Sequence, residues 1–417
     1  MTTTAAPSTP TTAAAPIVAP APMLDIHGRP AAQAWQLATP TLHINHGSFG
    51  AVPTQVLAYQ ADLKAQMESS PVKWFIAATG LIKESRRKMA ALLGTSEENM
   101  SFVPNASAGA TVVLNSMEFG PGDEILVSNH GYGAVVMGAE RKIKAAGGIL
   151  RTAHIPINAT ADDIVSAFEE RLSSCTKLVI TDEITSPTAM LFPVKRIAEL
   201  AHRYGARVLI DGAHAPGLIR EDPLDLGADY WIGNLHKFVC CPRGCAMLIV
   251  STELAQGVHP LINSWGRDLP YPERFDMQGT LDQTSYLCAP YTYEYIENTF
   301  GWDRARQYIQ TLADYGQELI AAAFEKETGE NHHVDYTQRA PGMRLVRLPK
   351  GIGQDHDSDD MLRDRVSAAF DVETAFTSFD GIGYLRLSSF IYNTAADYQR
   401  FADECVPALC QWAKESA

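Results

Sequence analysis

The chain has 417 residues, of which 46% are hydrophobic and 20% are charged, so it can bury a large core. Its length predicts two domains, or one large domain with a smaller partner. The formal net charge of −14 argues against nucleic acid or an anionic membrane surface as the main partner, because both reward a basic patch that the sequence does not show. No run of about 18 apolar residues is present, so we expect no transmembrane span.

The N-terminal residues 1–23 are rich in Ala, Pro and Thr and lack the basic start and apolar core of a secretory signal, so we predict a disordered tail. The seven cysteines are an odd number in a chain too long to depend on disulfides, which favours a reduced, cytoplasmic protein. Cys240, Cys241 and Cys245 cluster, but no second pair of Cys or His residues stands at finger-like spacing, so we predict core residues and no metal.

From about residue 85 to 255, short β-rich runs alternate with helical patterns, which is typical of an α/β fold with a mainly parallel sheet. We predict helices at 160–174 and 194–205, and strands at 124–130, 149–156, 177–183, 207–214 and 245–251. A long amphipathic helix at 303–327 follows, then strand-like runs at 342–349 and 381–389 and a closing helix. The predicted organisation is an N-terminal segment and loop (24–50), a large domain (51–298) and a small C-terminal α+β domain (299–417).

Two polar residues follow apolar runs at the carboxyl ends of predicted strands, where open parallel sheets collect their ligands. Asp211 directly follows "RVLI", and Lys237 comes 26 residues later, so the two could lie on neighbouring strand ends. A lysine in a partly apolar cleft has its ammonium form disfavoured and can act as a nucleophile, while an aspartate there can keep a pyridine nitrogen protonated. The pair therefore suits pyridoxal phosphate. The alternative is an exposed lysine and a helix-capping aspartate.

The segment "PNASAGATVVLNS" places small residues at the start of an apolar helix. Such a start leaves backbone N–H groups open to an anion, and the helix dipole assists. The pattern predicts a phosphate site there, with an ordinary helix cap as the alternative.

Several ordered segments resemble the class V aminotransferase superfamily, in its isopenicillin N epimerase branch. They include "HINHGSFGAVP", "PNASAGATVVLNS", "SNHGYGAV", "TSPTAMLFPV", "DGAHAPGLI", "DYWIGNLHKFVCCPRG", "QGTLD" and "GYLRLSSFIYNTAADY". The resemblance implies a fold-type-I pyridoxal 5′-phosphate enzyme, with a large and a small domain, that works on a small amino-acid substrate. It also implies a homodimer whose active site is shared between the subunits.

The resemblance assigns roles to individual residues. Lys237 would carry the cofactor as a Schiff base, and Asp211 would pair with its pyridine nitrogen. His214, or Ser186 as a second candidate, would lie near the phenolic oxygen of the ring. The implied phosphate contacts are Ala106, Ser107, Asn234, His236 and, from the partner subunit, Thr280. Desulfurase relatives have serine at the position of Asn234.

The resemblance also implies a ring that stacks on the cofactor, for which we favour Tyr132 over His130. Arg386 matches the family arginine that holds the substrate α-carboxylate through two parallel hydrogen bonds. Because Arg386 lies between two leucines in a predicted strand, its side chain must point away from their face, to solvent or into a cleft. The backbone of Gly47 and Ser48 would complete the carboxylate site.

The branch shares one step, which is removal of the Cα proton by the lysine. Reprotonation on the opposite face gives an epimerase, loss of a β or γ leaving group gives a lyase such as a cysteine-sulfoxide lyase, and internal attack gives a cyclase of secondary metabolism. We favour an isopenicillin N epimerase-like reaction. A persulfide-forming desulfurase is disfavoured, because no cysteine lies between Cys288 and Cys405 to receive the sulfur. A non-catalytic role is disfavoured because Lys237, Asp211 and Arg386 are all present.

Overall fold

The computed structural model describes residues 18–416, so most of the predicted N-terminal tail lies outside the described residues. Met23, the last residue of that predicted tail, is buried, and its carbonyl oxygen accepts a hydrogen bond from the Ala31 N–H. None of the helices in the described range combines the length and the apolar character that crossing a bilayer requires.

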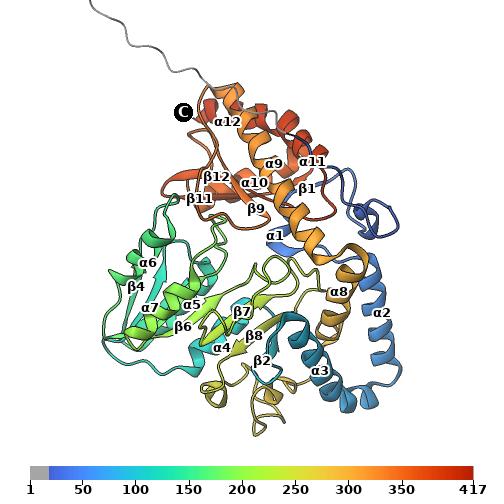
Figure 1. Ribbon diagram of the computed structural model, residues 1–417, viewed down its shortest axis with the longest axis vertical. Helices are drawn as coiled ribbons and strands as arrows, with labels where there is room; N and C mark the ends of the chain where they lie inside the picture. The colour runs from blue at the N-terminus through green and yellow to red at the C-terminus, as the bar shows by residue number, and fades with distance from the viewer. Residues whose placement is uncertain (1–17, 417) are drawn as a thin grey trace, which may run out of the picture.

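A seven-stranded sheet lies in the lower part of the molecule in the view of Figure 1, below the C-terminal strands β9, β11 and β12. In spatial order its strands are β2 (Met100–Val103), β8 (Ala246–Val250), β7 (Tyr230–Asn234), β6 (Arg207–Asp211), β5 (Thr176–Asp182), β3 (Glu124–Ser128) and β4 (Ile149–Ala153). Only β8 runs antiparallel to its neighbours. It follows β7 after a short connection, whereas a parallel neighbour needs a longer crossover. The predicted mainly parallel α/β sheet is confirmed.

Helices cover both faces of this sheet, which explains why its strands are apolar throughout. On one face, α4 (Ala106–Ser116) and α5 (Gly133–Ala145) share a core with Leu178, Leu209 and Ile232. On the other face, α6 (Ala161–Glu169) and α7 (Val194–Arg203) share a core with alternate residues of the same strands, such as Val179, Val208 and Trp231. Cys240, Cys241 and Cys245 are fully buried in this second core, as predicted.

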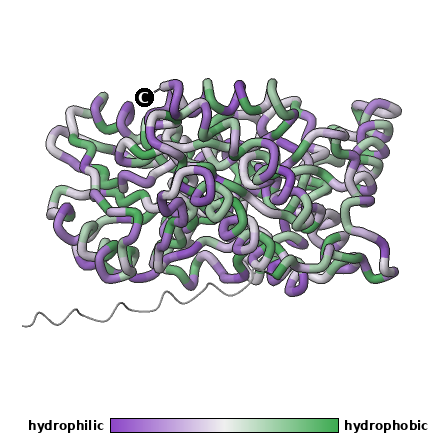
Figure 2. The backbone as a smooth tube through the Cα atoms, turned by 90° about the horizontal axis from the view of Figure 1, so that it is seen from above, coloured by the Kyte–Doolittle hydropathy of each residue, from purple (hydrophilic) through white to green (hydrophobic). Residues whose placement is uncertain are grey.

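Three further helices pack against one another beside the sheet. They are α2 (Thr54–Ser69), α3 (Pro71–Leu93) and α8 (Thr284–Phe300). Pro71 begins α3, where its missing N–H costs nothing, and Gly94 ends it in the left-handed conformation. Hydrophilic segments are frequent along the periphery of the molecule in Figure 2.

The C-terminal part forms a three-stranded antiparallel sheet in the order β11-β12-β9, covered by helices. Its elements are α9 (Trp302–Thr328), β9 (Met343–Arg347), α10 (His356–Phe370), β10 (Val372–Glu373), β11 (Ala375–Phe379), β12 (Ile382–Ser388), α11 (Ala395–Arg400), a π-helical turn (Phe401–Cys405) and α12 (Val406–Ser416). The N-terminal strand β1 (Leu42–His43) pairs in parallel with β10. The proposed domain boundary at 298/299 falls just before Gly301, which separates α8 from α9.

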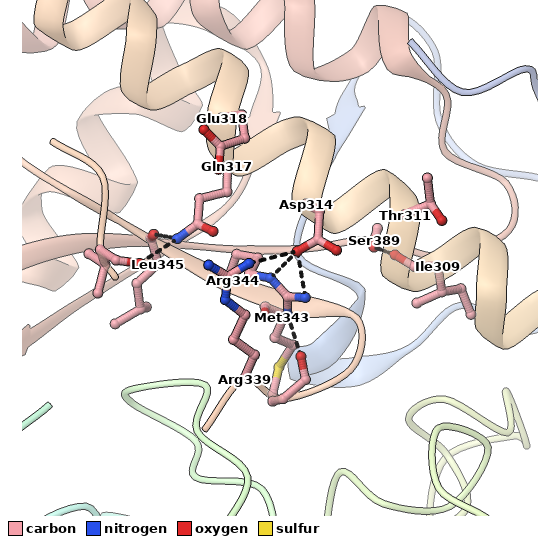
Figure 3. A network of polar contacts seen from close by, with 12 residues as sticks. Ile309, Thr311, Asp314, Gln317, Glu318, Arg339, Met343, Arg344, Leu345 and Ser389 are labelled. Carbon is pink, nitrogen blue, oxygen red and sulfur yellow. Dashed lines mark hydrogen bonds and ion pairs between the residues drawn. The ribbon is translucent and has the colours of Figure 1, made fainter. Parts of the chain in front are cut away.

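A buried polar network joins α9 to β9 (Figure 3). The Arg344 side chain is 1% exposed, forms an ion pair of 2.7 Å with Asp314 of α9, and donates to the carbonyl oxygens of Ala340 and Met343. Gln317 donates to the Leu345 carbonyl oxygen at 2.7 Å. Leu345 of β9 is the register partner of Arg386 in β12. The network therefore holds β9, the strand that pairs with the Arg386 strand, against α9.

Candidate active site

Polar residues lie at the carboxyl ends of three neighbouring strands, and two of them, Asp211 and Lys237, are predicted site residues. Asp211 ends β6, and Lys237 follows β7, the next strand in the sheet, by three residues. Asp182 ends β5 and is the register partner of Asp211. The expectation that Asp211 and Lys237 lie on neighbouring strand ends is therefore met.

Lys237 is a partly buried amine without a carboxylate partner in hydrogen-bond range among the described residues. Its Nζ lies 2.9 Å from His214 Nε2. Burial, and then the charge of Arg386, lower the pKa of Lys237 to about 7, while the carboxyl groups of Asp211 and Asp182 act in the opposite direction. Burial also holds the pKa of His214 well below its usual value, so this imidazole is neutral. The pair thus presents an amine that can be neutral close to physiological pH.

Asp211 has one satisfied and one unsatisfied carboxyl oxygen. Its Oδ1 accepts a hydrogen bond of 3.0 Å from the Ala213 N–H, while Oδ2 is buried without a partner. Burial raises the pKa of this carboxyl. An unpaired buried acceptor is costly, so Oδ2 is placed to accept a hydrogen bond from a bound group.

Arg386 of β12 points into the protein interior and not to solvent, since only 5% of the residue is exposed. Its Nη1 donates to the carbonyl oxygen and the hydroxyl of Ser186, at 2.6 and 3.1 Å. Its Nη2 donates to Ser48 Oγ at 2.9 Å, and Nε has no partner. Burial lowers the pKa of this guanidinium to about 10. No carboxylate of the described chain pairs with Arg386, so the fork is available to an anionic ligand.

Ser186 therefore lies against the guanidinium group of Arg386. The resemblance had offered Ser186 as a second candidate beside the phenolic oxygen of the cofactor, and the contact that the structure gives it is with the arginine.

The loop at 45–50 closes the site from the side of the N-terminal segment. Ser48 Oγ donates to Asn45 Oδ1 at 2.7 Å, which holds Ser48 against Arg386. A Cβ atom on Gly47 would lie 2.8 Å from side-chain atoms of Met343 and Ser388. One on Gly50, which has a φ of +64°, would lie 2.5 Å from the carbonyl oxygens of His236 and Lys237. The glycines thus let this loop approach the lysine segment closely.

His46 fastens the same loop and was not singled out from the sequence. Its ring stacks on Phe390, and its nitrogens contact Tyr392 Oη at 3.0 Å and the Lys237 carbonyl oxygen at 3.2 Å. Burial lowers the pKa of His46 to about 3, so the ring is neutral. Asn45 was missed as well, although both residues lie in the glycine-rich segment that drew attention to the loop.

The start of α4 faces the same edge of the sheet. Asn105 Oδ1 caps the helix by accepting from the Ala108 N–H at 2.8 Å. Asn234 Oδ1 accepts from the Ala106 N–H at 2.9 Å, so this N–H is already bonded within the chain. Between them, the Ser107 N–H makes no hydrogen bond to the described residues. Asn234 thus ties β7 to α4, and Ser107 keeps an N–H that can bind an anion.

His236 and Thr280 differ in their surroundings. His236 is partly buried, and its Nδ1 lies 2.8 Å from the Cys245 carbonyl oxygen, which leaves Nε2 as the nitrogen that can face a ligand. Thr280 is exposed in the connection that precedes α8.

The two candidate stacking rings are clearly distinguished. His130 is fully buried, with Nδ1 2.7 Å from Thr188 Oγ1 and Nε2 2.8 Å from the Ile155 carbonyl oxygen, and it packs on Phe192 and Phe379. Tyr132 is 45% exposed at the start of α5. It lies close enough to Arg386 to raise the pKa of the guanidinium slightly, against the larger lowering by burial. The exposed ring of Tyr132 is the one that a cofactor could cover.

With this geometry in place, comparisons with known proteins identify the class of protein. The sequence model for class V aminotransferases matches residues 49–401, so the chain belongs to this family. An Arabidopsis thaliana protein described as a probable chloroplastic L-cysteine desulfhydrase is 27% identical to it, over 86% of this chain and 81% of that protein. The isopenicillin N epimerase of Amycolatopsis lactamdurans is 26% identical, over 87% of this chain and 93% of the epimerase.

Solved structures share the fold. C-DES, a cystine C–S lyase solved with glycine covalently linked to its PLP cofactor, superposes with a TM-score of 0.75 over 91% of this chain and 99% of C-DES, at 17% identity. The protein is thus an enzyme of the pyridoxal 5′-phosphate-dependent class V family, with the type I fold.

The residues of this chain fit that cofactor. The orphaned Asp211 Oδ2 is an acceptor for a pyridinium N–H, and Lys237 offers the amine that the aldehyde carbon requires. Ser107 at the start of α4 suits the phosphate group.

Proposed function

We propose that this enzyme removes the α-proton of an amino-acid substrate, with Lys237 as the base, and completes an isopenicillin N epimerase-like reaction by reprotonation. The observation that carries the proposal is that the weakly basic amine of Lys237 and the buried carboxyl group of Asp211 lie on neighbouring strand ends, within reach of the charge of Arg386 from the smaller sheet. The Arg386 guanidinium has no carboxylate partner among the described residues. Bound pyridoxal phosphate supplies the electron sink for the charge left on Cα.

The proposed roles follow from the contacts. Arg386 binds the substrate α-carboxylate, while Ser48 and Ser186 hold the guanidinium plane in place. A carboxylate fixed in this way orients the Cα–H bond toward the Lys237 amine, which His214 holds at 2.9 Å. Asp211 would accept a hydrogen bond from the pyridinium N–H of the cofactor through its unpartnered Oδ2, and Tyr132 would cover the cofactor ring.

A second candidate is β-elimination with cleavage of a C–S bond. Epimerisation needs a proton donor on the face opposite Lys237, and the buried His130 has both nitrogens engaged, which leaves the Tyr132 hydroxyl as the candidate on that side. Elimination needs only Lys237, which takes the Cα proton and can return it to the departing sulfur. Relatives described as an L-cysteine desulfhydrase and a cystine C–S lyase support this alternative.

Incubation of the holoenzyme with L-amino acids and their sulfur conjugates in deuterium oxide tests the proposal. For a substrate that turns over, we expect Cα deuterium in recovered substrate or epimerised product, measured by mass spectrometry and chiral chromatography. Release of thiol together with a keto acid would select the elimination. Turnover of a substrate whose product keeps the original Cα hydrogen would rule out both.

The active unit that we propose is a homodimer with a shared site. The connection between β8 and α8, which includes the exposed Thr280, presents large apolar side chains to solvent. Trp265 is 91% exposed, and Leu261, Ile262, Leu269 and Leu281 are between 38% and 47% exposed. An exposed apolar segment of this kind suits contact with a second copy of the chain, which would bring Thr280 to the phosphate of the partner's cofactor.

We expect Thr280→Ala to weaken cofactor binding in both sites of the dimer by roughly tenfold or more, because one hydrogen bond to a charged phosphate is lost. Equilibrium titration of the apoprotein with pyridoxal phosphate measures the change. Thr311→Ala is the matched control, since Thr311 is an exposed threonine on α9 that bonds only to its own helix. A monomer in sedimentation that retains full activity would contradict the shared site.

A further inference from the structure

The carboxyl group of Asp182 lies beside the site, and nothing in the proposed reaction uses it. Asp182 is 4% exposed at the end of β5, and its register partner across the parallel ladder is Asp211. Sequence reasoning included Asp182 in a strand but assigned it no role.

The two carboxyl groups point to the same face of the sheet. Leu178 and Ile180, at alternate positions before Asp182, lie in the same core as Leu209, which stands two residues before Asp211. Because side chains alternate along a strand, Asp182 and Asp211 share this face, about 5 Å apart at their Cα atoms. Glu183 points the other way, where it accepts from Trp231 Nε1 at 2.9 Å.

We propose that Asp182 is a positioning residue that carries the proton of this carboxyl pair and thereby keeps the Asp211 carboxylate ionised toward the pyridine nitrogen of the cofactor. This inference rests on the proposed role of Asp211. Two buried carboxylates side by side do not both ionise readily, so the pair holds one proton.

The surroundings decide which carboxyl group holds that proton. Asp211 receives the Ala213 N–H on Oδ1, and a pyridinium N–H at Oδ2 would favour its ionised form further. Burial and the neighbouring Asp211 hold the pKa of Asp182 well above its usual value, and the Tyr132 N–H and the charge of Lys237 offset this only in part. Arg386 lowers the pKa of both Lys237 and His214. Glu183, on the other face of the sheet, has its pKa raised by burial and, in part, by the charge of Asp211.

The first test uses the apoprotein and needs no substrate. A carboxyl group whose pKa is raised by folding destabilises the folded state as pH rises from the unfolded value, about 3.9, through the folded value. Asp182→Asn mimics the protonated form and removes this loss. We therefore expect the free energy of unfolding of Asp182→Asn, relative to the unaltered protein, to increase with pH across that window in urea titrations. A difference that stays constant with pH would overturn the inference.

The second test compares cofactor binding. We expect Asp182→Asn to bind pyridoxal phosphate within about threefold of the unaltered protein, because the amide keeps the shape of the neutral carboxyl group. Asp211→Asn should weaken binding by roughly tenfold or more, the scale of a lost charged hydrogen bond. Equal weakening in both variants would show that Asp182 is itself ionised and would refute the inference. Neither readout requires turnover, so failure of the proposed reaction is distinguishable from failure of this inference.

Discussion

Lys237→Ala is expected to abolish turnover and the covalent attachment of the cofactor. The amine serves as both attachment point and base, and loss of a positioned acid–base group alone costs roughly 10²- to 10⁴-fold in rate. Treatment of the holoenzyme with borohydride, followed by peptide mass spectrometry, should place the reduced cofactor on Lys237 in the unaltered protein and nowhere in the variant. Lys83→Ala is the matched control, because Lys83 is an exposed surface lysine paired with Glu273.

The pH dependence of covalent cofactor binding is a second test of the assignment of Lys237. Only the neutral amine attacks an aldehyde, and burial lowers the pKa of Lys237 to about 7. The rate at which the apoprotein binds pyridoxal phosphate covalently should therefore rise with pH through about 7 and level off above it, instead of continuing to rise toward the ordinary lysine value of about 10.4. If borohydride still fixes the cofactor to another lysine in Lys237→Ala, the assignment of Lys237 as the attachment point is wrong.

The sheet could be predicted from the sequence because its strands carry local signals. The runs around Leu209 and Val179 are continuously apolar and are separated by amphipathic helices, which is how a strand buried on both faces is encoded. The reversed direction of β8 carries no such signal, because a buried strand has the same composition in either direction. The pairing of β1 with β10 joins residues about 330 apart and has no local signature either.

The neighbouring positions of Asp211 and Lys237 could be predicted from the sequence, because each follows an apolar strand run, while their roles and that of Arg386 stay predictions. Asp182 could not be assigned a role from the sequence, because an aspartate at the end of a strand is common. Only the register of β5 against β6 shows that it lies beside Asp211. The roles of His46 and Asn45 could not be predicted either. Their contacts with Tyr392 and Ser48 form only because the loop at 45–50 folds back onto the segment around Lys237. Long-range pairing of this kind is decided by the assembled fold.

Arg386→Lys is expected to reduce kcat/KM by roughly 30- to 5,000-fold, which corresponds to about 2 to 5 kcal/mol for breaking a buried charged contact. The guanidinium group presents two parallel donors, and the hydroxyls of Ser48 and Ser186 hold its plane. An ammonium group keeps the charge but cannot make the paired contact, so the carboxylate would rotate and the Cα–H bond would leave the direction of the Lys237 amine. Most of the loss should therefore appear in kcat, together with slower exchange of the Cα proton into deuterium oxide. Arg347→Lys is the matched control, because Arg347 is an exposed arginine on the neighbouring strand β9, and it should leave both quantities unchanged. Wild-type kcat/KM in Arg386→Lys would mean that another group holds the carboxylate, and the proposed geometry of proton removal would be wrong.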